Sequence, residues 1–147
     1  MRYLLTSLFL FGLSITFGQS KYNRILNSID DNKTNYSGIA QQIWSYAEMG
    51  YQETQSSALL QKTLEEAGFK ITTGVADIPT AFTATYGSGG PVIAVLGEFD
   101  ALPGLSQKAV PYKVSNDGKA GHACGHHLFG TASVAAAIAF NTFIAIS

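Results

Sequence analysis

The chain has 147 residues, with nine Lys and Arg against ten Asp and Glu, and a formal net charge of −1. A nearly neutral balance excludes a nucleic-acid-binding protein, which would carry a basic excess on one face. Hydrophobic residues make up 46% and charged residues 13%, which excludes a disordered chain and a coiled coil. The charged fraction is about half of the usual share in soluble domains, and the apolar excess lies at the two ends.

The N-terminal segment has the pattern of a secretory signal peptide. Arg2 precedes an uncharged apolar run over residues 3–17, and Thr16 and Gly18 are small residues suited to cleavage after Gly18. The run is short for a stable membrane span. We therefore expect a signal peptide over residues 1–18, and a periplasmic or extracellular protein without a stable membrane span once the peptide is removed. An uncleaved N-terminal anchor is the alternative.

Two helices are predicted next. Ser37 is a capping residue for the first, which Gly50 ends, and Thr54 is a capping residue for the second, which Gly68 ends. Apolar residues recur at helical spacing in both, namely Ile39, Ile43 and Ala47 in the first and Leu59, Leu60, Leu64 and Ala67 in the second.

Strands are predicted after the second helix. Residues 69–73 form a short strand, and residues 80–86 alternate between two faces. A glycine-rich turn at 87–90 leads to a continuous apolar run over 91–96, so 80–86 and 91–96 are expected to pair as a hairpin. Residues 101–121 contain glycine and proline breaks and are expected to be rich in loops. The sequence thus predicts an α/β fold with a mixed sheet flanked by helices.

The C-terminal segment, residues 131–147, is Ala-rich and uncharged. It is too short for a membrane span, and Asn141 interrupts it, so we expect a buried helix. A helix that is apolar all round normally lies inside a larger protein. We therefore expect residues 19–147 to be part of a larger domain, in a truncated chain.

A cluster of metal-binding residue types stands out. All three histidines and the only cysteine fall within residues 122–127. In an extended backbone Cys124 and His126 project to the same side and could reach one metal ion together, with His122 approaching from that side. Two ligands are too few for a closed site, so other donors must come from elsewhere. Two alternatives stay open: a loop of surface histidines with a buried small cysteine, and a Cys124 thiol activated by histidine.

Two carboxylates follow the apolar run. Glu98 and Asp100 are two residues apart just beyond a predicted strand, where they could line a crevice and orient a metal ion or a ligating imidazole. Solvated acids in a turn are the alternative. Residues 48–53 are best interpreted as a polar turn between helices. The glycines of 87–90 lack the pattern of a phosphate-binding loop, which excludes nucleotide binding.

Four stretches occur together, in order and well separated. They are Glu48-x-Gly50-x-x-Glu53, Ile78-Pro79-Thr80-Ala81-Phe82, Leu96-Gly97-Glu98-Phe99-Asp100-Ala101-Leu102-Pro103-Gly104-Leu105-Ser106-Gln107 and Gly121-His122-Ala123-Cys124-Gly125-His126-His127-Leu128-Phe129-Gly130-Thr131-Ala132. Over residues 39–138 the chain resembles a family of metal-dependent amidohydrolases within the co-catalytic metallopeptidases. That family includes auxin-conjugate hydrolases, aminoacylases and aminobenzoyl-glutamate hydrolases. His127 replaces the Asp that auxin-conjugate hydrolases usually carry there, and Tyr46-Ala47 replaces their His-Pro. These departures favour the aminobenzoyl-glutamate hydrolase branch.

The resemblance implies a role for each candidate residue. Cys124 and His126 would be ligands of a manganese or zinc centre, dinuclear in the full-length parent. Asp100 would be the catalytic-site aspartate that supports the metal site, and His122 and Glu98 would support the ligands without binding the metal themselves. In such enzymes the metals polarise the scissile carbonyl and activate a bridging water, whose proton a glutamate accepts. That Glu-Glu pair, the further His and Glu ligands and the lid domain would lie beyond residue 147.

The function implied is hydrolysis of a small-molecule amide. The substrates would be N-acyl amino acids, aminobenzoyl-glutamate-like conjugates or dipeptides, and the full-length parent would be a candidate homodimer. The 147-residue chain would then be the N-terminal part of the catalytic domain and inactive alone. The alternative is a non-catalytic product that at most binds a divalent metal.

Overall fold

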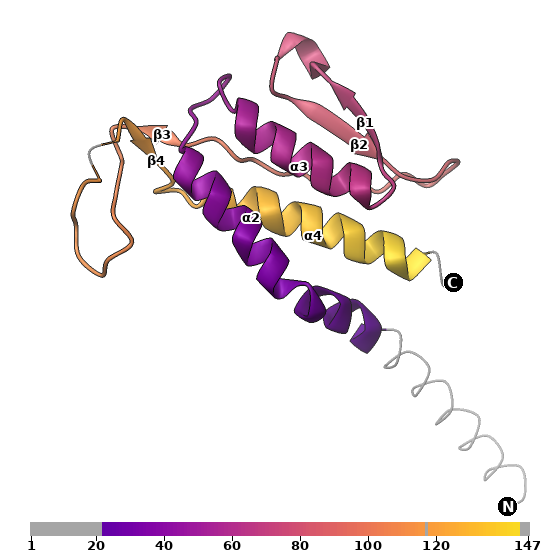
Figure 1. The fold of residues 1–147 in the computed structure, drawn as a ribbon. Helices are drawn as coiled ribbons and strands as arrows, with labels where there is room; N and C mark the ends of the chain where they lie inside the picture. Colours follow the sequence, from indigo (N-terminus) through magenta and orange to yellow (C-terminus); the bar gives the residue numbers. More distant parts are fainter. Residues whose placement is uncertain (1–21, 117, 145–147) are drawn as a thin grey trace, which may run out of the picture.

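The computed structural model describes residues 22–116 and 118–144. A helix over residues 22–31 precedes α2 (Lys33–Tyr46), and the remaining elements follow in chain order: α3 (Thr54–Glu66), β1 (Lys70–Thr73), the 3-10 turn η1 (Val75–Asp77), β2 (Phe82–Thr85), β3 (Leu102–Pro103), β4 (Ala120–Gly121) and α4 (His126–Ile144). Helices α2, α3 and α4 pack against one another, and the β1–β2 hairpin lies against α3 (Figure 1). Among the described residues no helix is both long and apolar enough to cross a membrane. The predicted signal peptide lies outside the described residues.

The hydrophobic core lies where the three helices meet. Ile43 is fully buried and Leu60 is 1% exposed. Ile39 and Leu64, each one helical turn from these residues, join them, and Val134 contributes from α4. The apolar spacing in the sequence therefore predicted the buried faces of α2 and α3 correctly, because side chains four residues apart share one face of a helix.

The helix ends agree with the sequence only where a local signal is strong. Helix α3 begins at Thr54, which was predicted as its capping residue, but Glu53 holds the cap position; Gly68 after the end of α3 takes a left-handed φ of 87°, as expected of a helix stop. The predicted start of α2 at Ser37 is wrong, since α2 already begins at Lys33. Only Asn32 separates it from the preceding helix, so no cap is needed at Ser37. The helix ends at Tyr46 because the next residue, Ala47, is left-handed, before Gly50 is reached.

The predicted hairpin between residues 80–86 and 91–96 is wrong. Strand β2 pairs with β1 instead, in antiparallel register from Lys70 opposite Thr85 to Thr73 opposite Phe82. Residues 91–96 belong to no strand, and Val92 is 84% exposed. A continuous apolar run indicates burial on both faces but does not identify the neighbouring strand. The α/β character is confirmed, but in place of the predicted mixed sheet the strands of the described residues form two separate antiparallel pairs, β1–β2 and β3–β4.

Helix α4 is buried on one side only. Val134, Ala135 and Ala139 are buried, whereas Leu128 and Phe129 are exposed. The helix begins at His126, five residues before the apolar segment from which it was predicted. We expected a buried helix, and in the described residues one face of α4 is buried while the other is exposed. The early start brings His126 into the first turn of a packed helix.

Candidate functional site

The segment that carries Glu98 and Asp100 is held tightly against α4. The Ser133 hydroxyl donates a hydrogen bond to the Leu96 carbonyl at 2.7 Å. A Cβ atom added at Gly130 would lie 2.9 Å from the Glu98 carbonyl oxygen, so only glycine allows this approach. Between the two acids, Phe99 packs against Phe82 with ring centroids 6.1 Å apart. Because alternate residues of an extended segment face opposite sides, Phe99 points to the core and both carboxylates point away from it.

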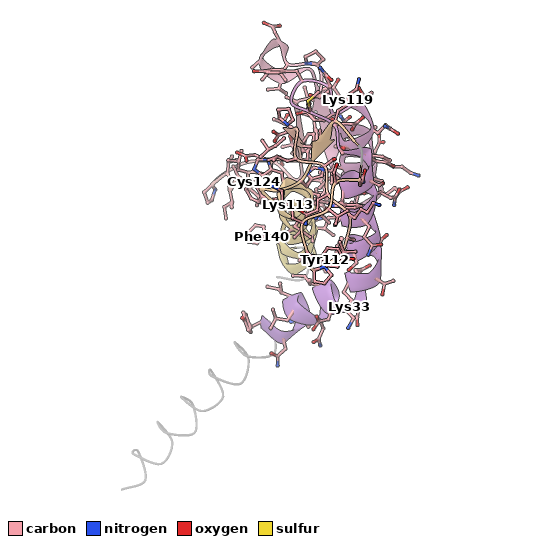
Figure 2. All side chains as sticks on the ribbon, turned by 90° about the vertical axis from the view of Figure 1, so that its left-hand side faces the viewer. Lys33, Tyr112, Lys113, Lys119, Cys124 and Phe140 are labelled. Carbon is pink, nitrogen blue, oxygen red and sulfur yellow. The ribbon has the colours of Figure 1, made fainter. Side chains whose placement is uncertain are left out.

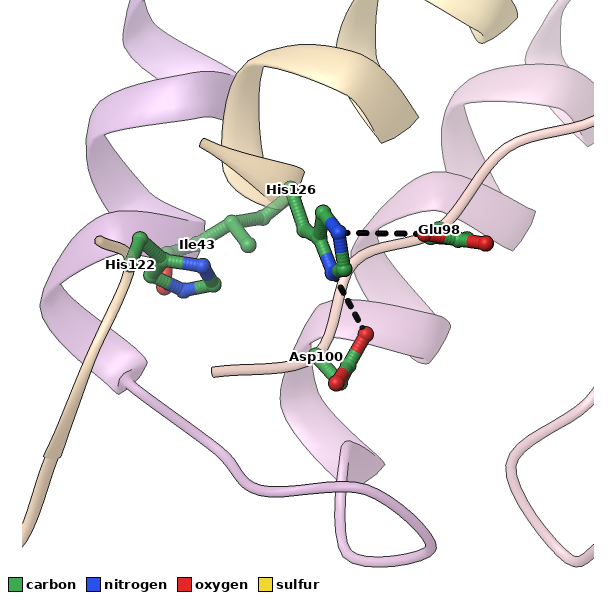
Figure 3. A network of polar contacts seen from close by, with 5 residues as sticks. All are labelled: Ile43, Glu98, Asp100, His122 and His126. Carbon is green, nitrogen blue, oxygen red and sulfur yellow. Dashed lines mark hydrogen bonds and ion pairs between the residues drawn. The ribbon is translucent and has the colours of Figure 1, made fainter. Parts of the chain in front are cut away.

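His126 lies between these two carboxylates, as Figure 3 shows. Its Nδ1 is 2.7 Å from Asp100 Oδ1 and its Nε2 is 3.0 Å from Glu98 Oε2. The His126 side chain is 18% exposed, whereas that of Glu98 is 51% exposed. A carboxylate bonded to one ring nitrogen fixes the orientation and tautomer of an imidazole, and this is how proteins prepare a histidine to bind a metal through its other nitrogen. Asp100 is placed for that role, and Nε2 lies on the more open side.

Asp100 is anchored from the turn between α2 and α3. The Ala101 amide donates a 2.7 Å hydrogen bond to the Glu48 carbonyl, and Met49 and Ala101 form a parallel β-bridge. The Glu48 carboxylate accepts hydrogen bonds from the backbone amides of Gln55 and Ser56, at 2.9 and 2.8 Å, and from the Ser56 hydroxyl at 2.8 Å. The polar turn predicted over residues 48–53 is thus a capping structure for α3, and it also holds the end of the segment that bears Asp100.

Glu48 gives the first testable expectation. Burial alone would raise the pKa of its carboxyl group, but hydrogen bonds from Gln55 and Ser56 outweigh this and lower the pKa. The ionised carboxylate therefore stabilises the fold above the unfolded-state pKa, and this contribution is lost as the pH falls through the lower folded-state value. Glu48→Gln should lower the free energy of unfolding by about 1 kcal/mol at neutral pH, the usual cost of a lost cap.

Urea unfolding over a series of pH values from neutral to acidic measures this effect. The difference between Glu48→Gln and the native chain should shrink progressively in acid, as the native carboxylate becomes protonated. Glu66→Gln is the matched control, because the contact that Glu66 makes among the described residues is an exposed ion pair with Lys62 within α3, and it should change little. A difference for Glu48→Gln that is independent of pH would contradict the assignment.

His122 contacts α2 rather than the carboxylates. It is 9% exposed, and its Nε2 lies 3.0 Å from the Ile43 carbonyl oxygen. Because a carbonyl only accepts hydrogen bonds, Nε2 must carry the hydrogen in this contact. The His127 ring lies beside it, with centroids 4.9 Å apart, and burial lowers the pKa of both rings. His122 therefore fastens the turn that precedes His126 to α2, while its role as support for a metal ligand stays a prediction.

Cys124 lies in a turn rather than in an extended segment. The Gly125 amide donates to the His122 carbonyl at 3.1 Å, and Gly125 takes a left-handed φ of 84°. The argument from extended backbone, which placed Cys124 and His126 on one side, therefore does not apply. The thiol is free and exposed, so the alternative of a buried small cysteine is wrong. Across residues 22–116 and 118–144, no three His, Cys, Asp or Glu side chains converge as a metal-binding group.

The structure brings together Glu98, Asp100 and His126, three of the five candidate residues, and leaves His122 and Cys124 outside this contact. Sequence reasoning missed two anchors of the site, the carbonyl groups of Ile43 and Glu48. Backbone carbonyls carry no sequence signal. The carboxylate of Glu48 does carry one, because an acid a few residues before a helix start is a candidate cap.

A histidine whose ring nitrogen is bonded to a carboxylate is an arrangement that proteins use to orient a metal ligand. Comparison with curated proteins adds a chemical class, because the relatives named below are hydrolases of amide bonds. The chain is 46% identical over 129 residues to one of the subunits of p-aminobenzoyl-glutamate hydrolase from Escherichia coli K12, a match that covers 86% of this chain and 27% of that protein. The resemblance to the amidohydrolase family, and to its aminobenzoyl-glutamate hydrolase branch, is therefore confirmed, and the chain is homologous to these enzymes.

Other relatives are also hydrolases of amide bonds. N-acetyl-L-cysteine deacetylase of Bacillus subtilis is 33% identical over 106 residues, covering 68% of this chain and 24% of that protein. Xaa-Arg dipeptidase of Mus musculus is 30% identical over 126 residues, covering 78% of this chain and 26% of that protein. The chain thus spans about a quarter of the length of these curated relatives. A scan against protein-family models finds no match.

Proposed function

We propose that the chain is part of the catalytic domain of a metal-dependent amidohydrolase. The parent would hydrolyse aminobenzoyl-glutamate-like conjugates, N-acyl amino acids or dipeptides. The observation that carries the proposal is His126, held through Nδ1 by Asp100 with Nε2 on the open side. The 46% identity to a subunit of p-aminobenzoyl-glutamate hydrolase supports the proposed substrate class.

The donor types fit manganese or zinc. Imidazole suits both metals, and an exposed thiolate is a zinc ligand. His126 and Cys124 would hold the metal, with Asp100 fixing the His126 tautomer and Glu98 beside Nε2. The described residues contain no group of three or more donors that could hold a metal ion, so we propose that the remaining ligands of a dinuclear site come from the rest of a longer parent. When bound, the metal would polarise the scissile carbonyl and lower the pKa of a water molecule.

Hydrolysis of aminobenzoyl-glutamate by the full-length parent tests this function. Turnover should require Mn²⁺ or Zn²⁺, stop on chelation and return when metal is added back, because the metal supplies the activated water. The 147-residue chain alone should show no turnover. A metal-loaded parent that leaves acyl-amino acid, aminobenzoyl-glutamate and dipeptide amides intact would refute the proposal. Light scattering on the same parent tests the homodimer.

Two other functions make different predictions in the same assay. If the chain is a non-catalytic product, it binds a divalent metal weakly at most, and turnover by the chain alone refutes that idea. If Cys124 is a nucleophile, an alkylating reagent should abolish turnover while a chelator should not. The exposed thiol of Cys124 makes this alternative accessible to test. The nucleophile hypothesis would be excluded if a chelator inhibits turnover and if bound metal protects the parent from the alkylating reagent.

Export of the protein is a separate proposal. It rests on the uncharged apolar run after Arg2 and on the small residues Thr16 and Gly18. Expression of the full reading frame, followed by fractionation and N-terminal sequencing, tests it. A mature protein that begins after Gly18 in the exported fraction is the expected result, and an intact N-terminus on cytoplasmic material would contradict it.

A further inference from the structure

The apolar run over residues 91–96 leads from β2 to β3 (Figure 1) and lies at the surface. All six residues are exposed, with Val92 at 84% and Leu96 at 75%. No charged residue occurs between Asp77 and Glu98. Soluble proteins usually protect such a run with charges, bulges or a covering element, because it is a template for pairing with another chain. The run is therefore a candidate interaction surface.

One backbone edge of this run is free of partners among the described residues. No backbone–backbone hydrogen bond in the described part of the chain involves residues 91–96. The Leu96 carbonyl accepts a hydrogen bond from the Ser133 hydroxyl of α4 at 2.7 Å. In an extended backbone the N–H and C=O groups of successive residues point to opposite edges, so those of the even-numbered residues face α4. The amides of Ile93 and Val95 therefore lie on the opposite edge.

That opposite edge already pairs as a strand a few residues further along the chain. The Ala101 amide donates a 2.7 Å hydrogen bond to the Glu48 carbonyl, and Ala101 forms a parallel bridge with Met49. Ala101 is odd-numbered like Ile93, so its amide points to the same edge of the extended segment. The segment therefore has the backbone geometry of a strand, and in the described residues its pairing does not extend back to the apolar run.

The charges that flank the run decide how two copies of it can pair. In a parallel pairing in register, Glu98 and Asp100 would each face the same acid of the other copy, and like charges directly opposite each other destabilise a ladder. An antiparallel pairing about a two-fold axis at Ile93 instead brings residues 91–95 of the two copies opposite one another. Glu98 then faces the uncharged Ser88. Both copies use the same surface in this arrangement, as a two-fold symmetric contact requires.

We propose that residues 91–96 are an interaction surface for a second copy of this chain, paired antiparallel. The Ile93 amide of each copy donates to the Ile93 carbonyl of the other, and the Val95 amide donates to the Pro91 carbonyl. Proline has no amide hydrogen, so Pro91 ends the ladder. A contact of this length is small for a protein interface, so the dimer should be weak and should form as the concentration rises. This pairing does not depend on the proposed amidohydrolase function, since no candidate site residue takes part in it.

Sedimentation velocity of the full chain over a wide range of concentration measures the association. We expect a monomer and a dimer in an equilibrium that shifts towards the dimer at high concentration. Ile93→Lys should weaken the dimer by at least about tenfold, because it places two like charges opposite each other at the two-fold axis. A chain that stays monomeric throughout would overturn the proposal and would leave this edge to another occupant, such as a strand of a longer parent.

A charge swap at the two-fold axis tests the register. Ile93→Glu should also weaken the dimer by itself, whereas an equimolar mixture of Ile93→Lys and Ile93→Glu should associate again, because opposite charges then face each other. Tyr112→Lys is the matched control, since Tyr112 lies in the loop between β3 and β4 and is 65% exposed against 64% for Ile93 (Figure 2). It should leave the dissociation constant within about twofold. Equal weakening by Tyr112→Lys, or no recovery in the mixture, would overturn the proposal.

Hydrogen exchange measures the pairing in the native chain, without any substitution. The Ile93 and Val95 amides should gain protection as the concentration rises, because they carry the hydrogen bonds of the ladder. The Val92 and Ala94 amides point to the other edge and should gain less. Association through any other surface would leave the exchange of all four amides unchanged, and that result would overturn the proposal.

Discussion

Replacing His126 by alanine is expected to lower the affinity of the full-length parent for Zn²⁺ or Mn²⁺ by more than about 100-fold, and to abolish amide hydrolysis with it. The imidazole is the best-oriented donor of the site, because Asp100 binds its Nδ1 at 2.7 Å, while Nε2, 3.0 Å from Glu98 Oε2, lies on the more open side, where a metal would replace that contact. Cys124→Ala should also lower affinity and activity together. Metal titration by calorimetry or competition with a chromogenic chelator measures the affinity.

Variants of the residues near His126 serve as controls, because they should lose metal affinity to smaller and different extents. Asp100→Asn should lower activity but reduce metal affinity by only about tenfold, since Asp100 orients the ligand without binding the metal. His127→Gln should leave metal affinity nearly unchanged, because His127 lies against the His122 ring rather than against either carboxylate. Equal losses for Asp100→Asn, Cys124→Ala and His126→Ala would show that the role assigned to Asp100 is wrong.

Gly121→Ala is expected to destabilise the fold by about 3 kcal/mol or more, the upper range for overpacking. A Cβ at this position would collide with the Leu105 carbonyl and would lie 3.0 Å from the Ser106 Cα, so backbone would have to move. Gly121 also pairs with Leu102 in the β3–β4 ladder. Because His122 follows directly, the same displacement should break its hydrogen bond to the Ile43 carbonyl.

Denaturant unfolding of the full chain measures this effect, and Gly38→Ala is the matched control. Gly38 lies within α2, and no atom lies within 4 Å of a Cβ added there. Alanine in a helix interior is favoured over glycine by up to about 1 kcal/mol, so Gly38→Ala should stabilise. If Gly121→Ala left the unfolding midpoint unchanged, the close approach of β4 to Leu105 would be contradicted.

Local signals predicted local structure well. Gly68 marks the end of α3 because a left-handed glycine acts within one turn of the chain. Thr54 was predicted as the cap of α3 but is its first residue, because Glu53 holds the cap position and the Glu48 carboxylate binds the first amides. The buried faces of α2 and α3 followed from apolar spacing. The partner of β2 did not, because strand pairing depends on which strands meet in space, and the apolar run at 91–96 is more hydrophobic than β1, the true partner.

The site, like the fold, was predictable where the signal is local and was not predictable where it depends on residues far away in the sequence. Two acids two residues apart were expected to share one side, and His126 does meet both of them. The position of Cys124 was not predictable from spacing, because the left-handed Gly125 turns the chain between the thiol and the imidazole. The anchoring of His122 to α2 depends on a carbonyl group far away in the sequence, and no residue pattern identifies it.

The hydrogen bond between His122 and Ile43 joins residues 79 positions apart, and the contact between His126 and Asp100 spans 26. Contacts of such sequence separation require closure of long loops before they contribute any energy, and they slow folding. During synthesis, α2, α3 and the β1–β2 hairpin emerge well before residue 122. The Asp100–His126 pair can therefore form only once residue 126 has been made, when α2, α3 and the β1–β2 hairpin have already emerged.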